Sequence, residues 1–190
     1  VGWLTIEGML DEAVVQRDNS YYLKRDYKGY HNANGAIFLD EDCSLASRPY
    51  TLMLYGHNMK TGAMFGNLRY YDDINYYRKN PFMTFDTLYE DGRYVVFASC
   101  IISTETGNWR SISFSDLTGT NRAAREEAIR GLLSCSDYKC AINIRSDDQL
   151  LLLITCTGDD TQRRIVAARR VRADETEEEL MAGVNRTTKR

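Results

Sequence analysis

The sequence has few prolines, few histidines and no long apolar run. Its 190 residues include two prolines and two histidines, and the longest unbroken aliphatic run covers Leu150 to Ile154. A membrane-spanning helix needs about 20 apolar residues, so this chain is not expected to cross a bilayer. A formal net charge of -3 predicts no general affinity for nucleic acid. The sequence starts at Val1 rather than at a methionine, which is compatible with an upstream targeting or anchoring segment.

The cysteines are odd in number, which argues against a disulfide framework. At least one thiol must stay free or pair between molecules. The spacing C-x4-C at positions 135 and 140 has no second Cys or His pair to complete it, so a zinc site is not expected. The five are Cys43, Cys100, Cys135, Cys140 and Cys156.

Short segments rich in β-branched and aromatic residues, separated by Asn, Asp and Gly, predict a mainly β protein. Eight or nine strands in a chain of this length predict one domain, either a barrel or a sandwich. The expected strands are Trp3–Glu7, Ala13–Gln16, Ala36–Leu39, Tyr50–Tyr55, Phe82–Asp86, Arg93–Ser103, Ala141–Arg145, Leu150–Thr155 and Arg164–Val171.

Two segments have helical periodicity. Residues 122–134 place apolar side chains on one stripe, and Asn121 is a suitable N-cap. Residues 63–77 form the second, which the adjacent Asp72 and Asp73 can break in two. Both lie between strands and are expected to decorate a barrel. Residues 173–190 are charged and poor in core residues, so we expect a solvated helix or a frayed tail there.

Three positions combine reactive side chains with strand ends. His57 follows an apolar run and Gly56, which permits a sharp bend. Cys156 ends the run that begins at Leu150, where a buried strand meets solvent. Arg163 and Arg164 open a strand with apolar residues on both faces, so one of them is directed toward a buried surface.

Each position also has a plain structural interpretation. A lone histidine at a strand end can be held by backbone hydrogen bonds, and a cysteine is most often a buried hydrophobe, as we expect for Cys100. Either arginine can be an ordinary edge-strand charge. Together, however, thiol, imidazole and guanidinium are the groups that acyl transfer through a thioester requires.

Longer motifs point to a known family. They are "VGWLTIEG", "AVVQRDNSYYLKRDYKGYHNANGAIFLD", "YGHNMKTGAMFGNL", "FDTLYEDGRYVVFAS" and "LITCTGDDTQRRIV". With these motifs the chain resembles the class B sortases, the cysteine transpeptidases of Gram-positive cell surfaces, from residue 1 to about residue 172. The resemblance implies a closed β-barrel of about eight strands over residues 1–172, followed by a tail or short helix at 173–190.

The resemblance also implies the site residues. His57 of the Y-G-H-N-M motif, Cys156 of the T-C motif and Arg164, eight residues after the cysteine, would be catalytic. Arg163 is one position early and is expected on the opposite face, unless a bulge exchanges the two. Because His31 lies in the polar loop "KGYHNANG", it is not expected to act as acid or base. Residues expected to contact substrate are Ile154, Thr155 and Thr157.

The implied reaction cleaves an Asn-Pro-x-Thr-like C-terminal sorting signal after its threonine. Cys156 would attack the carbonyl, His57 would protonate the departing amine, and Arg164 with the N–H of Thr157 would stabilise the oxyanion. An amine from a peptidoglycan precursor would resolve the thioester; a pilin lysine in its place would make the enzyme a pilus polymerase. No metal or organic cofactor enters this scheme. An N-terminal anchor preceding this chain would hold the enzyme at the extracellular face of the membrane.

One residue departs from the family pattern. Class B sortases commonly have serine two positions before the cysteine, where this chain has Ile154. The departure leaves the nucleophile unchanged but bears on the recognition sequence. It also motivates an alternative from another functional class, a barrel that binds peptides without cleaving them.

Overall fold

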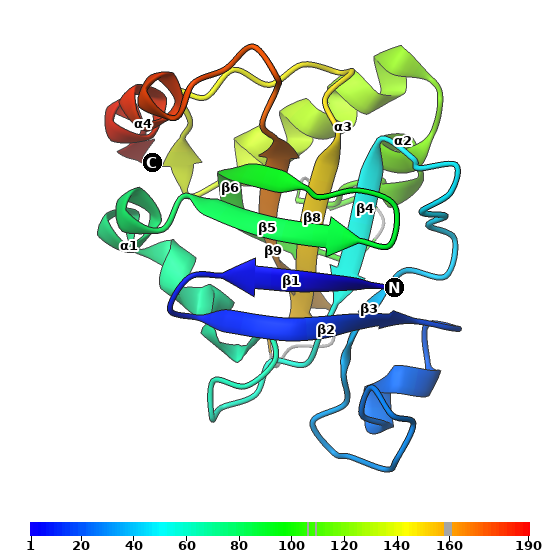
Figure 1. Cartoon of the computed structure of the whole chain (residues 1–190). Coiled ribbons are helices and arrows are strands. Elements are labelled where there is room, and N and C mark those ends of the chain that lie inside the picture. The colour runs from blue at the N-terminus through cyan, green and yellow to red at the C-terminus, as the bar shows by residue number, and fades with distance from the viewer. Residues whose placement is uncertain (106, 109, 158–160) are drawn as a thin grey trace.

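A closed barrel organises most of the chain in a computed structural model (Figure 1). The structure describes residues 1–105, 107, 108, 110–157 and 161–190, except for the side chain of Cys156. Eight strands close in the order β1-β2-β3-β4-β8-β9-β6-β5, so the mainly β prediction is confirmed and the barrel is the correct alternative. The strands are β1 (Gly2–Ile6), β2 (Leu10–Gln16), β3 (Ile37–Leu39), β4 (Thr51–Tyr55), β5 (Phe82–Thr87), β6 (Arg93–Ser103), β8 (Leu150–Cys156) and β9 (Gln162–Arg170).

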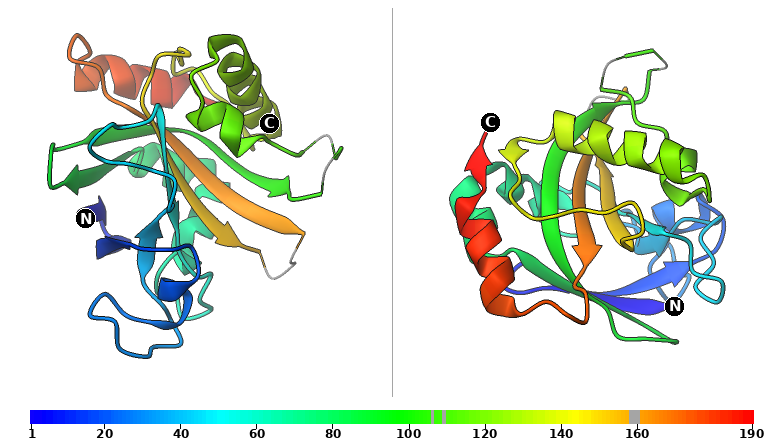
Figure 2. Two further views of the ribbon diagram at one scale, coloured as in Figure 1. Left: turned by 90° about the vertical axis from the view of Figure 1, so that its right-hand side faces the viewer. Right: turned by 90° about the horizontal axis from the view of Figure 1, so that it is seen from above.

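Helices lie between the strands, as expected from their place in the sequence. Asn121 caps α3, its side chain accepting hydrogen bonds from the backbone N–H groups of Ala123 and Ala124, and α3 packs against β6. Figure 2 shows α3 and α4 on different sides of the barrel. The expected helical segment at 63–77 is indeed divided, at Asp73. The helices are η1 (Tyr21–Lys24), η2 (Gly66–Asp72), α1 (Ile74–Lys79), α2 (Phe114–Thr118), α3 (Arg122–Cys135) and α4 (Glu177–Arg186).

The prediction of a strand at 141–145 is wrong, because these residues form no strand in the structure. A short strand lies just before it, β7 (Tyr138–Lys139), which pairs with β10 (Thr188–Lys189). The apolar alternation at 141–145 reflects packing, since a Cβ built at Gly183 of α4 would lie 2.8 Å from Cδ1 of Ile142. Burial against a helix therefore produced the same period-two pattern as a strand.

The C-terminal segment packs against the body of the protein. Thr176 and Glu179 form a reciprocal capping box at the start of α4, and Leu180 and Val184 are buried. In Figures 1 and 2 the helix lies beside α1, where Nη2 of Arg78 donates to the carbonyl of Thr187 at 2.9 Å. A helix is present as expected, but it is docked rather than solvated or frayed.

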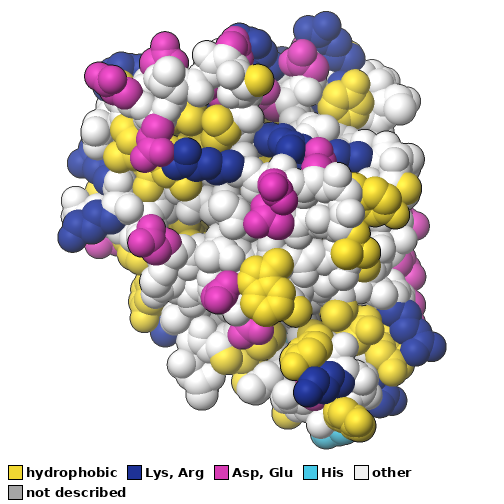
Figure 3. All heavy atoms as spheres, viewed as in Figure 1, with side chains coloured by type: hydrophobic (Ala, Val, Ile, Leu, Met, Phe, Trp, Pro, Cys, Tyr) yellow, Lys and Arg dark blue, Asp and Glu magenta, His cyan; other side chains and the backbone are white. Residues whose placement is uncertain are grey.

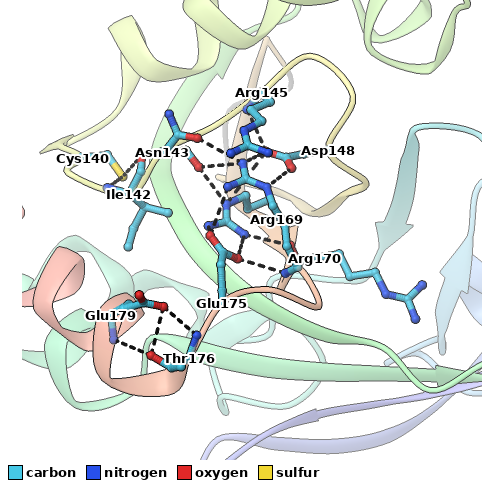
Figure 4. A network of polar contacts seen from close by, with 11 residues as sticks. Cys140, Ile142, Asn143, Arg145, Asp148, Arg169, Arg170, Glu175, Thr176 and Glu179 are labelled. Atoms are coloured by element: carbon cyan, nitrogen blue, oxygen red, sulfur yellow. Dashed lines mark hydrogen bonds and ion pairs between the residues drawn. The ribbon is translucent and has the colours of Figure 1, made fainter.

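A buried ion network fixes one end of the β8–β9 pair (Figure 4). Arg169, of which only 1% is exposed, donates to both carboxylate oxygens of Glu175 and, through Nε, to the carbonyl of Asn143 at 2.9 Å. Asp148 accepts from Nε and Nη2 of Arg172 at 2.8 and 2.7 Å. Burial by itself raises the pKa of Glu175, but hydrogen bonds from Arg169 and from the Arg172 N–H outweigh it and hold that pKa below its ordinary value.

The surface carries charges of both signs. On the face in Figure 3, basic and acidic side chains are interspersed with small apolar patches. Within the described part of the chain, no helix combines the length and apolar character needed to cross a membrane. Nor do its described residues include a group of three or more His, Cys, Asp or Glu arranged to hold a metal ion.

Candidate active site

Three strand ends meet at one edge of the barrel. Strands β4 and β8 are parallel, with Tyr55 opposite Ile154, so both end at the same edge. His57 follows the end of β4, and β8 ends at Cys156. Strand β9 runs antiparallel to β8 and begins here, with Arg163 opposite Cys156. Residues far apart in sequence are thus brought to one edge by strand pairing.

A pocket of about 290 Å³ opens at this edge. It is close to the lower end of the size range of small-ligand sites, roughly 300 Å³. The rings of Phe38 and Tyr55, 5.5 Å apart, form an apolar part of the wall. The segment between β2 and β3 closes another side. The lining residues are Asn19, Leu23, Phe38, Tyr55, Gly56, His57, Ile154, Thr155 and Arg163.

The turn at His57 is held by backbone contacts and by close packing. The carbonyl of His57 accepts from the N–H of Phe65 at 3.0 Å, and the Gly56 N–H donates to the carbonyl of Ile154 at 3.3 Å. Gly56 is not in the positive-φ region, so the expected special bend is not the reason for glycine. A Cβ at position 56 would instead lie 2.9 Å from Cδ2 of Phe65. Close approach of that ring therefore explains the glycine.

The two arginines at the start of β9 have different surroundings. Arg163 lines the pocket, and its positive charge opposes the rise that burial causes in the pKa of Tyr55. Arg164 stands opposite Thr155 in the β8–β9 pair and binds Asp72, and its side chain is 12% exposed. The antiparallel register thus pairs position 163 with the backbone of Cys156 and position 164 with Thr155.

Arg164 belongs to a charged cluster that extends toward β7. Asp137 lies near it, and burial raises the pKa of that carboxyl, with Asp72 adding to the rise and Arg164 opposing it. The ion pair with Asp72 is a structural role for Arg164. The predicted catalytic role of Arg164 stays a prediction.

The expected substrate-contacting residues lie at or beside the pocket. Ile154 and Thr155 line it, and both are buried. Oγ1 of Thr155 is buried and has no hydrogen-bond partner among the described residues. Thr157 follows the end of β8 and is half-buried.

The cysteines other than Cys156 are free and shielded. Cys43, Cys100 and Cys135 are buried and Cys140 is half-buried. Burial raises the pKa of Cys43 to about 11 and also raises the pKa of Cys100, so both remain protonated thiols at neutral pH. The expectation that Cys100 is a buried hydrophobe is confirmed. The side chain of Cys156 lies outside the described part of the structure.

Four of the lining residues were not among the candidates predicted from the sequence. Asn19 and Leu23 come from the segment between β2 and β3, and Phe38 and Tyr55 come from paired strands. The segment at 19–23 was part of a motif that supported the family resemblance. No local pattern showed that it folds over the end of β4, because that contact depends on tertiary packing.

Comparisons with known proteins agree on one family. Residues 4–171 match the family described as "Sortase domain". The chain is 28% identical over 165 residues to sortase B of Listeria monocytogenes, covering 86% of this chain and 63% of that protein. It therefore spans less than two thirds of that relative. It is 27% identical to sortase B of Staphylococcus aureus, covering 90% of this chain and 69% of the relative.

Solved structures share the fold. Sortase B from Listeria monocytogenes superposes with a TM-score of 0.76 at 26% identity, covering 89% of this chain and 93% of that one. A Staphylococcus aureus sortase B–substrate complex gives a TM-score of 0.78 at 25% identity, covering 92% and 80% of the two chains. A Bacillus anthracis sortase B complex gives 0.77 at 29% identity, covering 90% and 78%.

Proposed function

The chain belongs to the sortase family, and we propose that it is a class B cysteine transpeptidase that acts on sorting signals at the cell surface. The observation that carries this proposal is the pocket at the shared end of β4, β8 and β9. His57 and Arg163 line it, and the backbone of Cys156 lies directly opposite Arg163. A thiol, an imidazole and a guanidinium are the three functional groups that thioester chemistry needs.

The proposed reaction proceeds through two acyl transfers. The Cys156 sulfur attacks the carbonyl carbon of the signal's threonine, forming a C–S bond, and the C–N bond to the next residue breaks. His57 supplies the proton that the departing amine takes up. An acceptor amine then attacks the thioester, forming a new C–N bond and releasing the sulfur, and His57 takes back a proton. The two steps together return the enzyme to its starting form.

The charge that forms on the carbonyl oxygen needs a fixed donor. Arg163 supports this role better than Arg164 because it lines the pocket; both guanidinium groups have partners, since Nη1 of Arg163 donates to the Gln162 carbonyl at 2.8 Å and Arg164 binds Asp72. We therefore propose Arg163 as the oxyanion donor, with the N–H of Thr157 as a second donor. Arg164 would act at a distance, by holding the start of β9 against η2.

The finer details of the substrates are also proposals. An Asn-Pro-x-Thr-like peptide is the donor that the class implies, and Thr155, which lines the pocket, would contact it. A peptidoglycan precursor amine is the first candidate acceptor, and a pilin lysine is the second. Membrane attachment would come from a segment outside this sequence.

Peptide cleavage tests the proposal. A library of sorting peptides is incubated with the protein, with and without glycine-type, diamino-acid or pilin-derived lysine amines, and products are identified by mass spectrometry. We expect cleavage after threonine and amide formation with one class of amine, both abolished by Cys156→Ala. Equal cleavage by Cys156→Ala would refute the proposal. Peptide binding without turnover would favour a non-catalytic barrel.

A further inference from the structure

The imidazole of His57 contacts the segment that closes one side of the pocket. Its Nε2 lies 2.7 Å from the carbonyl oxygen of Leu23. A carbonyl oxygen only accepts hydrogen bonds, so Nε2 must carry the proton. In the neutral ring Nδ1 is then the basic nitrogen, and it is the atom left to exchange protons with reacting groups.

The Leu23 carbonyl lies between two carbonyls that are already engaged. The Tyr22 carbonyl accepts from the Ala36 N–H, and the Lys24 carbonyl accepts from the Asn32 N–H, each at 3.0 Å. Both bonds tie this segment to the chain that leads into β3. The carbonyl between them is therefore held in place before His57 binds it.

The start of the segment is fixed as well. Oδ1 of Asp18 accepts from the backbone N–H groups of Ser20 and Tyr21 at 3.1 and 3.0 Å. The guanidinium of Arg17 lies 3.9 Å from the centre of the Tyr21 ring, and that of Arg25 lies 4.8 Å from it. A carbonyl on such a segment has little freedom to turn away from the imidazole.

Gly35 lies where the carbonyl and the imidazole meet. Its φ is +64°, and a Cβ there would lie 2.6 Å from the Tyr22 oxygen, 3.0 Å from the Leu23 oxygen and 3.1 Å from Cδ2 of His57. Such distances are too short for a side chain. Glycine at position 35 thus allows the segment to approach the histidine.

We propose that the Leu23 carbonyl is the positioning group of His57, holding the imidazole in the Nε2–H form with Nδ1 available to the nucleophile and the leaving amine. Catalytic histidines are commonly oriented by a hydrogen bond at the second ring nitrogen, and no Asp or Glu occurs in the described pocket lining. The same bond persists when the ring is doubly protonated, so proton transfer at Nδ1 requires no rearrangement at Nε2. The catalytic part rests on the proposed function; the tautomer does not.

Nitrogen-15 NMR of histidine-labelled protein tests the tautomer without substrate. The Cys156→Ala variant removes the thiol, and His31→Gln assigns the only other histidine. In the neutral imidazole of His57, we expect a proton bonded to Nε2 and a bare Nδ1. A neutral ring protonated at Nδ1 would overturn the proposal. Because no turnover is involved, this outcome is separate from any failure to cleave peptide.

A matched pair of variants tests the consequence for catalysis. Gly35→Ala crowds the contact, whereas Gly8→Ala introduces the same residue at φ +70° with nothing within 4 Å. Misplacing a catalytic group by an ångström costs about 100-fold in rate, so we expect kcat to fall about 10- to 100-fold in Gly35→Ala, with little change in KM, and the tautomer preference to be lost. A folded Gly35→Ala protein with the tautomer and kcat of Gly8→Ala would contradict the proposal. If Gly35→Ala fails to fold, the tautomer measurement above decides.

Discussion

Arg163 stands opposite Cys156 in the antiparallel pair of β8 and β9. Arg163 also lines the pocket at the edge of the barrel where β8 ends. Arg164 stands opposite Thr155 in the same strand pair and binds Asp72. The contrast between these neighbours leads to the first prediction.

Replacing each arginine by alanine should separate catalysis from stability. We expect Arg163→Ala to lower kcat/KM for acyl transfer by about 100- to 1,000-fold, the cost of losing one oxyanion donor. Arg164→Ala should lower the thermal midpoint by about 2–4 °C, as expected for a loss near 1 kcal/mol in a chain of this size, and change kcat/KM far less. Peptide kinetics and thermal unfolding measure the two effects. If Arg164→Ala lost more kcat/KM than Arg163→Ala at unchanged stability, Arg164 rather than Arg163 would be the oxyanion donor.

Cys156 should be the thiol that reacts first in the folded protein. Burial keeps Cys43 and Cys100 protonated, and thiolates are the reactive form. Brief treatment with iodoacetamide should add one group, located at Cys156 by peptide mass spectrometry. The Cys156→Ala variant should stay unmodified over the same time, and unfolded protein should be modified at every cysteine. Rapid labelling of Cys43 or Cys100 in folded protein would contradict this prediction, because it would show that their thiols are accessible and reactive.

Thr155→Val should affect substrate more than stability. The hydroxyl of Thr155 is buried without a described partner, a situation that costs about 1–3 kcal/mol, so an apolar replacement of the same shape should leave stability equal or higher. If the hydroxyl binds the peptide, KM should rise about tenfold, equivalent to about 1.4 kcal/mol. Thr155→Ser, which keeps the hydroxyl, is the control. An unchanged KM in the valine variant would exclude this contact.

Glu175→Gln tests the network that fixes the far end of β8 and β9. Removing the carboxylate takes the closer of two charged partners from buried Arg169 and leaves Asp148 at 3.9 Å from its Nε, so the unfolding free energy should fall by about 1–3 kcal/mol. Because the folded-state pKa of Glu175 is lowered, its contribution is present above the unfolded value of about 4.3 and is lost as pH falls through the folded value. Urea unfolding across acidic pH should therefore show a flatter pH dependence in the variant.

An exposed ion pair supplies the control for Glu175. Glu177 pairs with Arg93, and both side chains are largely exposed, so Glu177→Gln should cost at most about 1 kcal/mol. Equal losses in the two variants would mean that burial of Arg169 contributes nothing to the strength of its network.

Much of this architecture could be predicted from the sequence because local patterns encode it. The strands, the Asn121 cap and the broken helix near Asp73 follow from periodicity and capping chemistry. The strand expected at 141–145 failed because packing under α4 imitates alternation, and α4 itself was underestimated because three glutamates precede the buried Leu180.

The site was harder to predict in detail. Alternation shows that Arg163 and Arg164 face opposite sides, but which of them lines the pocket depends on how the surrounding segments pack. The contact between Leu23 and His57 joins segments 34 residues apart, so no local rule predicts it. The residue types of the site were readable from the sequence, whereas their orientation depends on tertiary contacts.

The central claim is that Cys156 forms a thioester in this pocket. The most direct measurement is intact-protein and peptide mass spectrometry after incubation with an Asn-Pro-x-Thr peptide in the absence of an added amine. The account predicts an acyl adduct on Cys156 that hydroxylamine removes and that is missing from His57→Ala and Cys156→Ala. Turnover of the peptide with no adduct on Cys156, or an adduct on a different residue, would contradict it.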